Sequence, residues 1–254
     1  MTDTDATPPY LQVAEALRVR IATGALEAGA RLPSLTQITA EFGYSGTVGQ
    51  RAYAVLVDEG LVISRPGAGH YVRSQEPPVT IFRRQRVPAG MGSPVAQLLA
   101  EQGVVGHWDA SSATARAGET TAARLEIAVG EGVMHTSYTY LADGEPVQLA
   151  ESWEPLAVTG ESLIVMPEAG PHAGIGVADR MAVIGIDVGV PVEQVRARAA
   201  TRAEAQRLGC PPAAPVMAIT RTYYDQSNSR PVETADIVLL GSRWVSEYGH
   251  RPQA

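Results

Sequence analysis

The sequence predicts an α+β protein with two units: a small helical unit, followed by a mostly antiparallel sheet with helices. Three observations predict this division. Apolar residues recur at helical spacing through the first 73 residues, a proline-rich stretch follows, and a helix–hairpin pattern then occurs twice. The predicted boundaries are residues 8–73 for the first unit, 74–90 for a linker and 91–248 for the second unit.

The first unit is predicted to contain three helices. Apolar residues of the first helix share one face from Tyr10 to Ile21. Ser34 and Gln37 form a capping box that starts a second helix, because each side chain can satisfy a free backbone N–H group. A tight turn at residues 43–45 follows, and Ser45 is expected to cap a third helix that ends near Gly60.

A hairpin is predicted behind the third helix. Residues 61–63 and 70–72 are short strand candidates on either side of a glycine-rich tip. This order of elements is that of a winged helix–turn–helix, whose last helix enters the DNA major groove. A small α/β domain without a nucleic-acid role would have the same order, so both interpretations stay open at this point.

Residues 74–90 are predicted to form a linker. Pro77, Pro78 and Pro88 interrupt regular structure, and the run 83–86 carries three arginines. The run fits a phosphate contact and a solvated basic turn equally well.

The second unit is predicted from two copies of a helix followed by a hairpin. In the first copy, a helix near residue 121 leads to strands 133–141 and 146–153. In the second, a capping box at Thr201 opens a helix that leads to strands 216–224 and 231–240. We expect one mostly antiparallel sheet with a pseudo-twofold relation, Glu151 opposite Asp236, and the helices packed on one face.

Three further elements complete the second unit. A helix is predicted to run from Pro94 to about Gln102, and another is predicted near residues 173–184. Residues 192–199 are predicted to form a strand that carries Arg196 and Arg198 on the same face.

Composition limits the class of protein. The chain has 254 residues, 45% of them hydrophobic, and a formal net charge of −7, which fits a globular protein with at most a local DNA-reading surface. It has no membrane-length apolar stretch and no signal-peptide core, so we expect a cytoplasmic protein. The single cysteine, Cys210, excludes an internal disulfide. No histidine has a metal-ligand spacing, and we expect neither metal nor cofactor.

Four segments of the first unit resemble a known family. They are Pro9-Tyr10, the segment from Gly29 to Ser34 with Arg31-Leu32-Pro33, Glu59-Gly60-Leu61-Val62, and the pattern from Gly67 to Val72. Together they resemble the DNA-binding domain of the GntR family of bacterial transcriptional regulators. Residues 141–147 and 230–233 are similar to the UTRA effector domain of the HutC subfamily, which shares its fold with chorismate lyase.

The resemblance implies a homodimeric, ligand-responsive regulator of the repressor type. It implies that the dimer binds double-stranded DNA at a palindromic operator and responds to a small-molecule effector. At the start of the third helix this sequence lacks two arginines that the family usually carries. Arg51 can pair with guanine and Gln50 with adenine. The candidate DNA-binding residues are Arg31, Ser34, Ser45, Thr47, Gln50, Arg51, Arg65 and His70.

The resemblance also directs attention to the strand before the Asp143-Gly144 turn. Family members that sense phosphorylated sugars carry an Arg-x-Arg pair there, whereas this sequence has Tyr138 and Tyr140. An aromatic, cationic or polyol ligand therefore fits better than a phosphate. The alternative is that the tyrosines belong to the sheet core. The candidate effector-binding residues are Tyr138, Tyr140, Glu151, Trp153, Arg196, Arg198, Tyr223, Glu233 and Asp236.

Two other classes of function compete with a regulator. A chorismate lyase-like enzyme shares the expected fold, but the sequence shows no catalytic motif. Such an enzyme would need several arginines to bind the two carboxylates of chorismate, and Arg196 and Arg198 are the only candidates. A small-molecule-binding protein with a degenerate DNA-binding head would explain the missing arginines. A turnover assay with chorismate tests the first alternative, and DNA selection tests the second.

Overall fold

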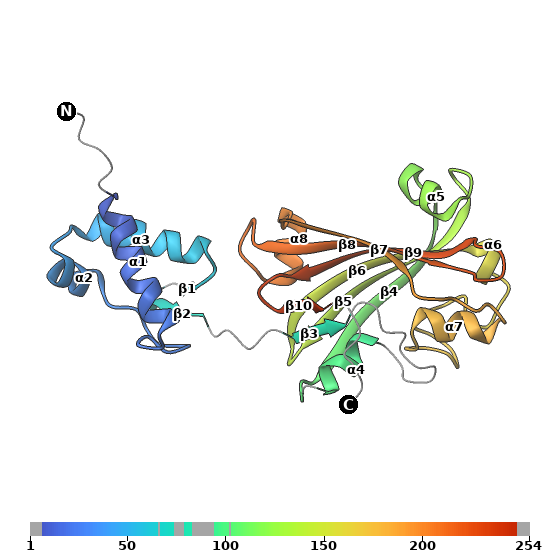
Figure 1. Cartoon of the computed structure of the whole chain (residues 1–254), viewed down its shortest axis with the longest axis horizontal. Helices are drawn as coiled ribbons and strands as arrows, with labels where there is room; N and C mark the ends of the chain where they lie inside the picture. The colour runs from blue at the N-terminus through green and yellow to red at the C-terminus, as the bar shows by residue number, and fades with distance from the viewer. Residues whose placement is uncertain (1–6, 66, 74–78, 83–93, 102, 248–254) are drawn as a thin grey trace. The chain divides into compact units, whose positions relative to one another are not determined.

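The computed structural model describes residues 7–65, 67–73, 79–82, 94–101 and 103–247. The chain divides into two compact units, Met1–Glu76 and Pro77–Ala254, and each is described by itself (Figure 1). We call them the N-terminal and C-terminal units. Most of the predicted linker, residues 74–90, lies outside the described residues.

The N-terminal unit has the predicted order of elements. Its helices are α1 (Pro9–Ala22), α2 (Leu35–Phe42) and α3 (Gly46–Asp58), and its hairpin consists of β1 (Val62–Arg65) and β2 (Gly69–Val72). The three helices bury Val13, Leu17, Ile38 and Leu56 completely in one apolar core, which also receives Val62 and Val72 of the hairpin. Helical periodicity predicts the four helical residues of this core, Val13, Leu17, Ile38 and Leu56, on the inner faces of their helices.

The helix–turn–helix turn depends on two local features. The predicted capping box of α2 is confirmed. Ser34 Oγ accepts a hydrogen bond from the Gln37 backbone N–H, and Gln37 Oε1 accepts one from the Ser34 backbone N–H. Gly43 ends α2 with a φ of 72°, a left-handed conformation that glycine adopts without steric cost. The prediction for Ser45 was wrong in part: it occupies the N-cap position of α3, but its side chain makes no capping hydrogen bond.

A six-stranded antiparallel sheet forms the centre of the C-terminal unit, in the order β4-β5-β6-β9-β8-β7. The strands are β4 (Gly106–Arg116), β5 (Gly132–Ala142), β6 (Glu145–Pro155), β7 (Val192–Ala199), β8 (Pro215–Tyr224) and β9 (Pro231–Leu240). The two predicted hairpins meet at the centre, where β6 pairs with β9 and Glu151 lies opposite Asp236 as expected. Positive φ values at Asp143 (49°) and Gly144 (85°) make the tight turn of the first hairpin.

Helices cover both faces of this sheet, which corrects the prediction that they pack on one face. Helices α4 (Pro94–Glu101) and α7 (Val177–Val183) pack on one face, and α5 (Glu119–Leu125) and α8 (Arg202–Leu208) pack on the other (Figure 1). The central strand β9 is buried along nearly its whole length, so its inward and outward side chains both need cover. We call the side with Tyr138 and Ala150 the pocket face and the side with Glu151 and Asp236 the groove face.

Several elements were not predicted from the sequence. The edge strand β4 is largely exposed and rich in Ala, Ser and Thr, so it lacks the apolar alternation that indicates a strand. Strand β3 (Val79–Phe82) lies inside the predicted linker and pairs in parallel with β10 (Trp244–Glu247). A short helix, α6 (Leu156–Thr159), follows β6. Within the described part of the chain, no helix is long and apolar enough to cross a membrane.

Candidate DNA-binding and effector sites

The exposed face of α3 carries three of the predicted DNA-binding residues. Thr47, Gln50 and Arg51 are exposed, and their spacing places them side by side on the helix surface. The opposite face buries Tyr53 and Leu56 in the core. Ser45 is also exposed at the start of the helix. The first two turns therefore present hydroxyl, amide and guanidinium groups, all of which can hydrogen-bond to base edges or phosphates.

The other predicted DNA-binding residues lie at the hairpin and at the start of α2. The Arg65 guanidinium lies 4.6 Å from the Tyr71 ring centre, and the exposed Arg31 packs beside Gly69. The His70 side chain makes contacts inside the N-terminal unit. Its ring centre lies 4.8 Å from that of Tyr53, and its Nε2 lies 3.3 Å from Ser64 Oγ. Ser34 caps α2, as described above.

The predicted effector-binding residues divide between the two faces of the sheet. Tyr138, Tyr140 and Tyr223 lie on the pocket face with Glu233 beside them. The other five candidates lie on the groove face: Glu151, Trp153, Arg196, Arg198 and Asp236. The structure therefore does not bring the nine residues into one site, because successive side chains of a strand point to opposite faces.

A cavity of about 120 Å³ lies on the pocket face, between the sheet and the segment that leads into α7. Aromatic side chains form much of its wall. The Tyr138 and Tyr140 rings lie 5.7 Å apart at an angle of 17°, and Trp108 lies 6.4 Å from Tyr140. Trp108 Nε1 donates to Glu168 Oε2 at 3.0 Å. Burial raises the pKa of the Tyr138 hydroxyl, and Tyr140 and Glu168 nearby raise it further, so this hydroxyl stays protonated.

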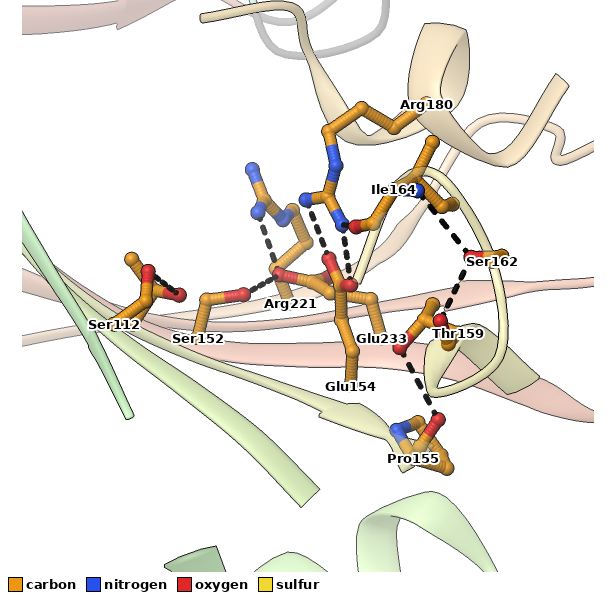
Figure 2. Close-up of polar contacts among 11 residues, drawn as sticks. Ser112, Ser152, Glu154, Pro155, Thr159, Ser162, Ile164, Arg180, Arg221 and Glu233 are labelled. Atoms are coloured by element: carbon orange, nitrogen blue, oxygen red, sulfur yellow. Dashed lines mark hydrogen bonds and ion pairs between the residues drawn. The ribbon is translucent and has the colours of Figure 1, made fainter. Parts of the chain in front are cut away.

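Two arginines that line the cavity, Arg180 and Arg221, each pair with a glutamate (Figure 2). Arg180 of α7 donates to both oxygens of Glu154, at 2.8 and 2.5 Å, and to the Ile164 carbonyl at 2.9 Å. Arg221 of β8 donates to Glu233 Oε1 at 2.8 Å, and Ser152 donates to the same oxygen at 2.8 Å. Because each guanidinium already neutralises a carboxylate, neither pair offers spare positive charge to an anion.

Desolvation dominates the electrostatics of the Glu154 carboxyl, whereas the carboxylate of Glu233 keeps the pKa of Arg221 raised despite its burial. Glu154 and Arg180 are each 2% exposed, and Glu233 is fully buried. Burial raises the pKa of the Glu154 carboxyl, and Arg180 opposes that rise. Four buried atoms in this region have no hydrogen-bond partner among the described residues: Gln148 Oε1, Arg180 Nε, Arg221 Nε and Glu233 Oε2. Since unpaired buried polar atoms are costly, they favour a polar occupant of the cavity.

Several charged residues of the groove face form ion pairs with one another. A groove of about 960 Å³ runs over β6 to β9 between α5 and α8. Glu151 accepts from Arg207 and Ser137, at 2.8 Å each, and lies 2.8 Å from His135 Nε2. Asp236 pairs with Arg124 at 2.7 Å, and Arg198 pairs with Glu204 at 2.6 Å. These acids are therefore already neutralised.

Sequence reasoning missed most of the residues that line the cavity, among them Trp108, Gln148, Glu168, Arg180 and Arg221. One signal could have found Arg221, because it alternates with Tyr223 on the same strand face. No local pattern marks Arg180 or Glu168, which reach the cavity from outside the repeated hairpins. The described residues contain no cluster of His, Cys, Asp and Glu that could hold a metal ion.

The comparisons with known proteins establish the class. Residues 9–72 match the bacterial regulatory proteins of the gntR family, and residues 109–244 match the UTRA domain. An HTH-type transcriptional regulator of Rhizobium meliloti is 30% identical over 226 residues, which cover 88% of this chain and 87% of that protein. The chain therefore belongs to the GntR family of bacterial regulatory proteins and carries a UTRA effector-binding domain. It is a DNA-binding transcriptional regulator and not an enzyme, as the sequence predicted.

Named relatives and solved structures agree with this assignment. The transcriptional repressor NagR of Bacillus subtilis is 28% identical and covers 94% of this chain and 93% of its own. The histidine utilization repressor of Klebsiella aerogenes is 25% identical over 61% of this chain and 62% of its own. A crystal structure of a GntR-family regulator is 41% identical, covers 97% of this chain and 99% of its own, and superimposes with a TM-score of 0.70.

Proposed function

We propose that the protein is a homodimeric repressor in the cytoplasm that a small-molecule effector releases from a palindromic operator. One observation carries this proposal: a single chain combines an exposed reading face on α3 with an aromatic cavity in a UTRA domain. Several relatives are named as repressors, which supports repression rather than activation. The two recognition helices of a dimer would meet half-sites about one helical turn apart.

The experiment that tests this function is selection of bound DNA from a random library. We expect an enriched sequence with inverted half-sites, which a gel-shift assay should then confirm with purified protein. A metabolite screen for release of that DNA follows. If no sequence is enriched, the protein is a small-molecule-binding protein with a degenerate DNA-binding head.

The effector would act through the strand that forms the cavity wall. Tyr138 lines the cavity with its side chain, while its carbonyl on the same strand accepts from Arg207 Nη2 of α8 at 3.2 Å. A ligand that shifts β5 would therefore change contacts on the groove face as well. The coupling free energy equals the difference in effector affinity between the DNA-competent and incompetent states, about 1–3 kcal/mol in comparable proteins.

We propose that the dimer contact lies within residues 91–248. The edge strand β7 is exposed along nearly its whole length and presents Val192 and Val195 to solvent. Residues 1–73 carry six arginines against seven acids, so one head alone should bind DNA weakly. Joining two heads raises the effective concentration of the second. Deleting residues 1–74 should leave a dimer by light scattering, whereas a monomer would place the interface in the head.

Phosphorylated sugars should not release the operator. The tyrosines at 138 and 140 supply no positive charge, and Arg180 and Arg221 are already paired with carboxylates. We expect no thermal shift and no operator release with glucosamine-6-phosphate or N-acetylglucosamine-6-phosphate. Release at micromolar concentrations of either sugar would contradict the prediction and would assign the phosphate to another group of the protein.

A further inference from the structure

One charge at the effector cavity has no counter-ion. The Arg180 and Arg221 guanidinium groups pair with Glu154 and Glu233, so these four charges cancel. Glu168 lines the same cavity, contacts the Trp108 indole N–H, and pairs with no cation among the described residues. The cavity and the groups around it therefore carry a net charge of −1 when all three carboxyls are ionised.

Three further properties of the cavity restrict its occupant. The walls present the rings of Trp108, Tyr138 and Tyr140, whose faces attract cations. Gln148 lines the cavity, is 4% exposed, and has an oxygen with no donor among the described residues, so it favours an occupant with an N–H or O–H group. The volume of about 120 Å³ matches a single ring, since a cavity of about 150 Å³ holds benzene.

We propose that the effector is a small planar nitrogen cation: an amidinium, a guanidinium or a protonated nitrogen heterocycle of about one ring. Its charge faces Glu168, its flat face lies against the aromatic wall, and its N–H groups supply the Gln148 oxygen. This inference rests on the proposed effector role of the cavity and specifies the chemistry of the ligand. Carboxylate and phosphate ligands are disfavoured, because they bring negative charge to Glu168 and no donor to Gln148.

The test uses three probes of the same shape that differ in charge: benzamidine, benzamide and benzoate. Each is titrated calorimetrically into the full-length protein at equal ionic strength. We expect benzamidine to bind about tenfold more tightly than benzamide, because a cation–π or ion-pair contact in a desolvated site has about that effect. Benzoate should bind most weakly. Benzoate binding as tightly as benzamidine overturns the proposal, and so does the absence of saturable binding by all three.

A variant pair assigns the effect to Glu168. Glu168→Gln keeps an oxygen for the Trp108 N–H and removes only the charge. It should weaken benzamidine to the level of benzamide and leave benzamide within about twofold. Glu145→Gln, at an exposed position in the β5–β6 hairpin, is the matched control and should leave both affinities unchanged. Unchanged benzamidine binding in Glu168→Gln would overturn the assignment.

Operator binding separates this inference from the proposed function. If the protein binds its selected operator but shows no preference for benzamidine, the proposed regulatory function stands and the proposed ligand class is wrong. If the protein prefers benzamidine through Glu168 but enriches no DNA sequence, the proposed ligand class stands and the proposed regulatory function is wrong.

Discussion

Glu154→Ala is expected to destabilise the C-terminal unit by about 3–5 kcal/mol, the cost of leaving one partner of a buried ion pair unpaired. The Arg180 guanidinium would keep only the Ile164 carbonyl as a partner, in a position where the whole residue is 2% exposed. Since domains of this size are stable by only about 5–15 kcal/mol, the unit would lose a substantial part of its stability.

Urea unfolding followed by tryptophan fluorescence measures this effect. All three tryptophans, Trp108, Trp153 and Trp244, lie in the C-terminal unit, so the signal reports on that unit alone. Arg124→Ala is the control, because its pair with Asp236 is partly exposed and should contribute at most about 1 kcal/mol. The double variant Glu154→Leu/Arg180→Met should recover much of the loss, since apolar residues of similar volume often replace a buried pair without cost. Equal effects of Glu154→Ala and Arg124→Ala would refute the interpretation.

Arg51→Ala is expected to cost about 1–3 kcal/mol of operator affinity and to relax the base preference at one position of each half-site. Arg51 is exposed on the same face of α3 as Thr47 and Gln50. Its guanidinium lies 5.9 Å from the Tyr10 ring centre, a weak contact that leaves its donors available for a guanine edge.

Competition binding with single-base variants of the selected operator measures this change. Arg20→Ala is the matched control. Arg20 lies on α1 of the same unit, and its guanidinium forms an ion pair with Glu41 of α2. It should leave base preference unchanged. A uniform loss on every DNA sequence, with a shallower salt dependence, would make Arg51 a phosphate contact and would end the base-reading assignment.

Local signals allowed most of the N-terminal unit to be predicted. Helical periodicity identified Val13, Leu17 and Leu56 as core, and the Ser34–Gln37 capping box located the start of α2 within one residue. These signals depend only on residues a few positions apart. The same is true of the two hairpins of the C-terminal unit, whose strands alternate and whose turns contain residues that tolerate positive φ. The exposed edge strand β4 lacked such a signal and was missed.

The sequence by itself determined the division into two units, the order of the elements in the N-terminal unit, the two central hairpins of the C-terminal unit with Glu151 opposite Asp236, and the family. Only the tertiary structure decided which residues form the cavity. Sequence reasoning assigned Tyr138 and Glu151 to one effector site, whereas the pairing of the strands places them on opposite faces, and only one of these faces carries the aromatic cavity. Arg180 and Glu168 come from a segment whose position depends on packing against the sheet, and their partners lie far away along the chain. A ligand site assembled from separate elements depends on packing between residues that are distant in the sequence. Local sequence patterns reflect only interactions between residues a few positions apart, so they do not predict such a site.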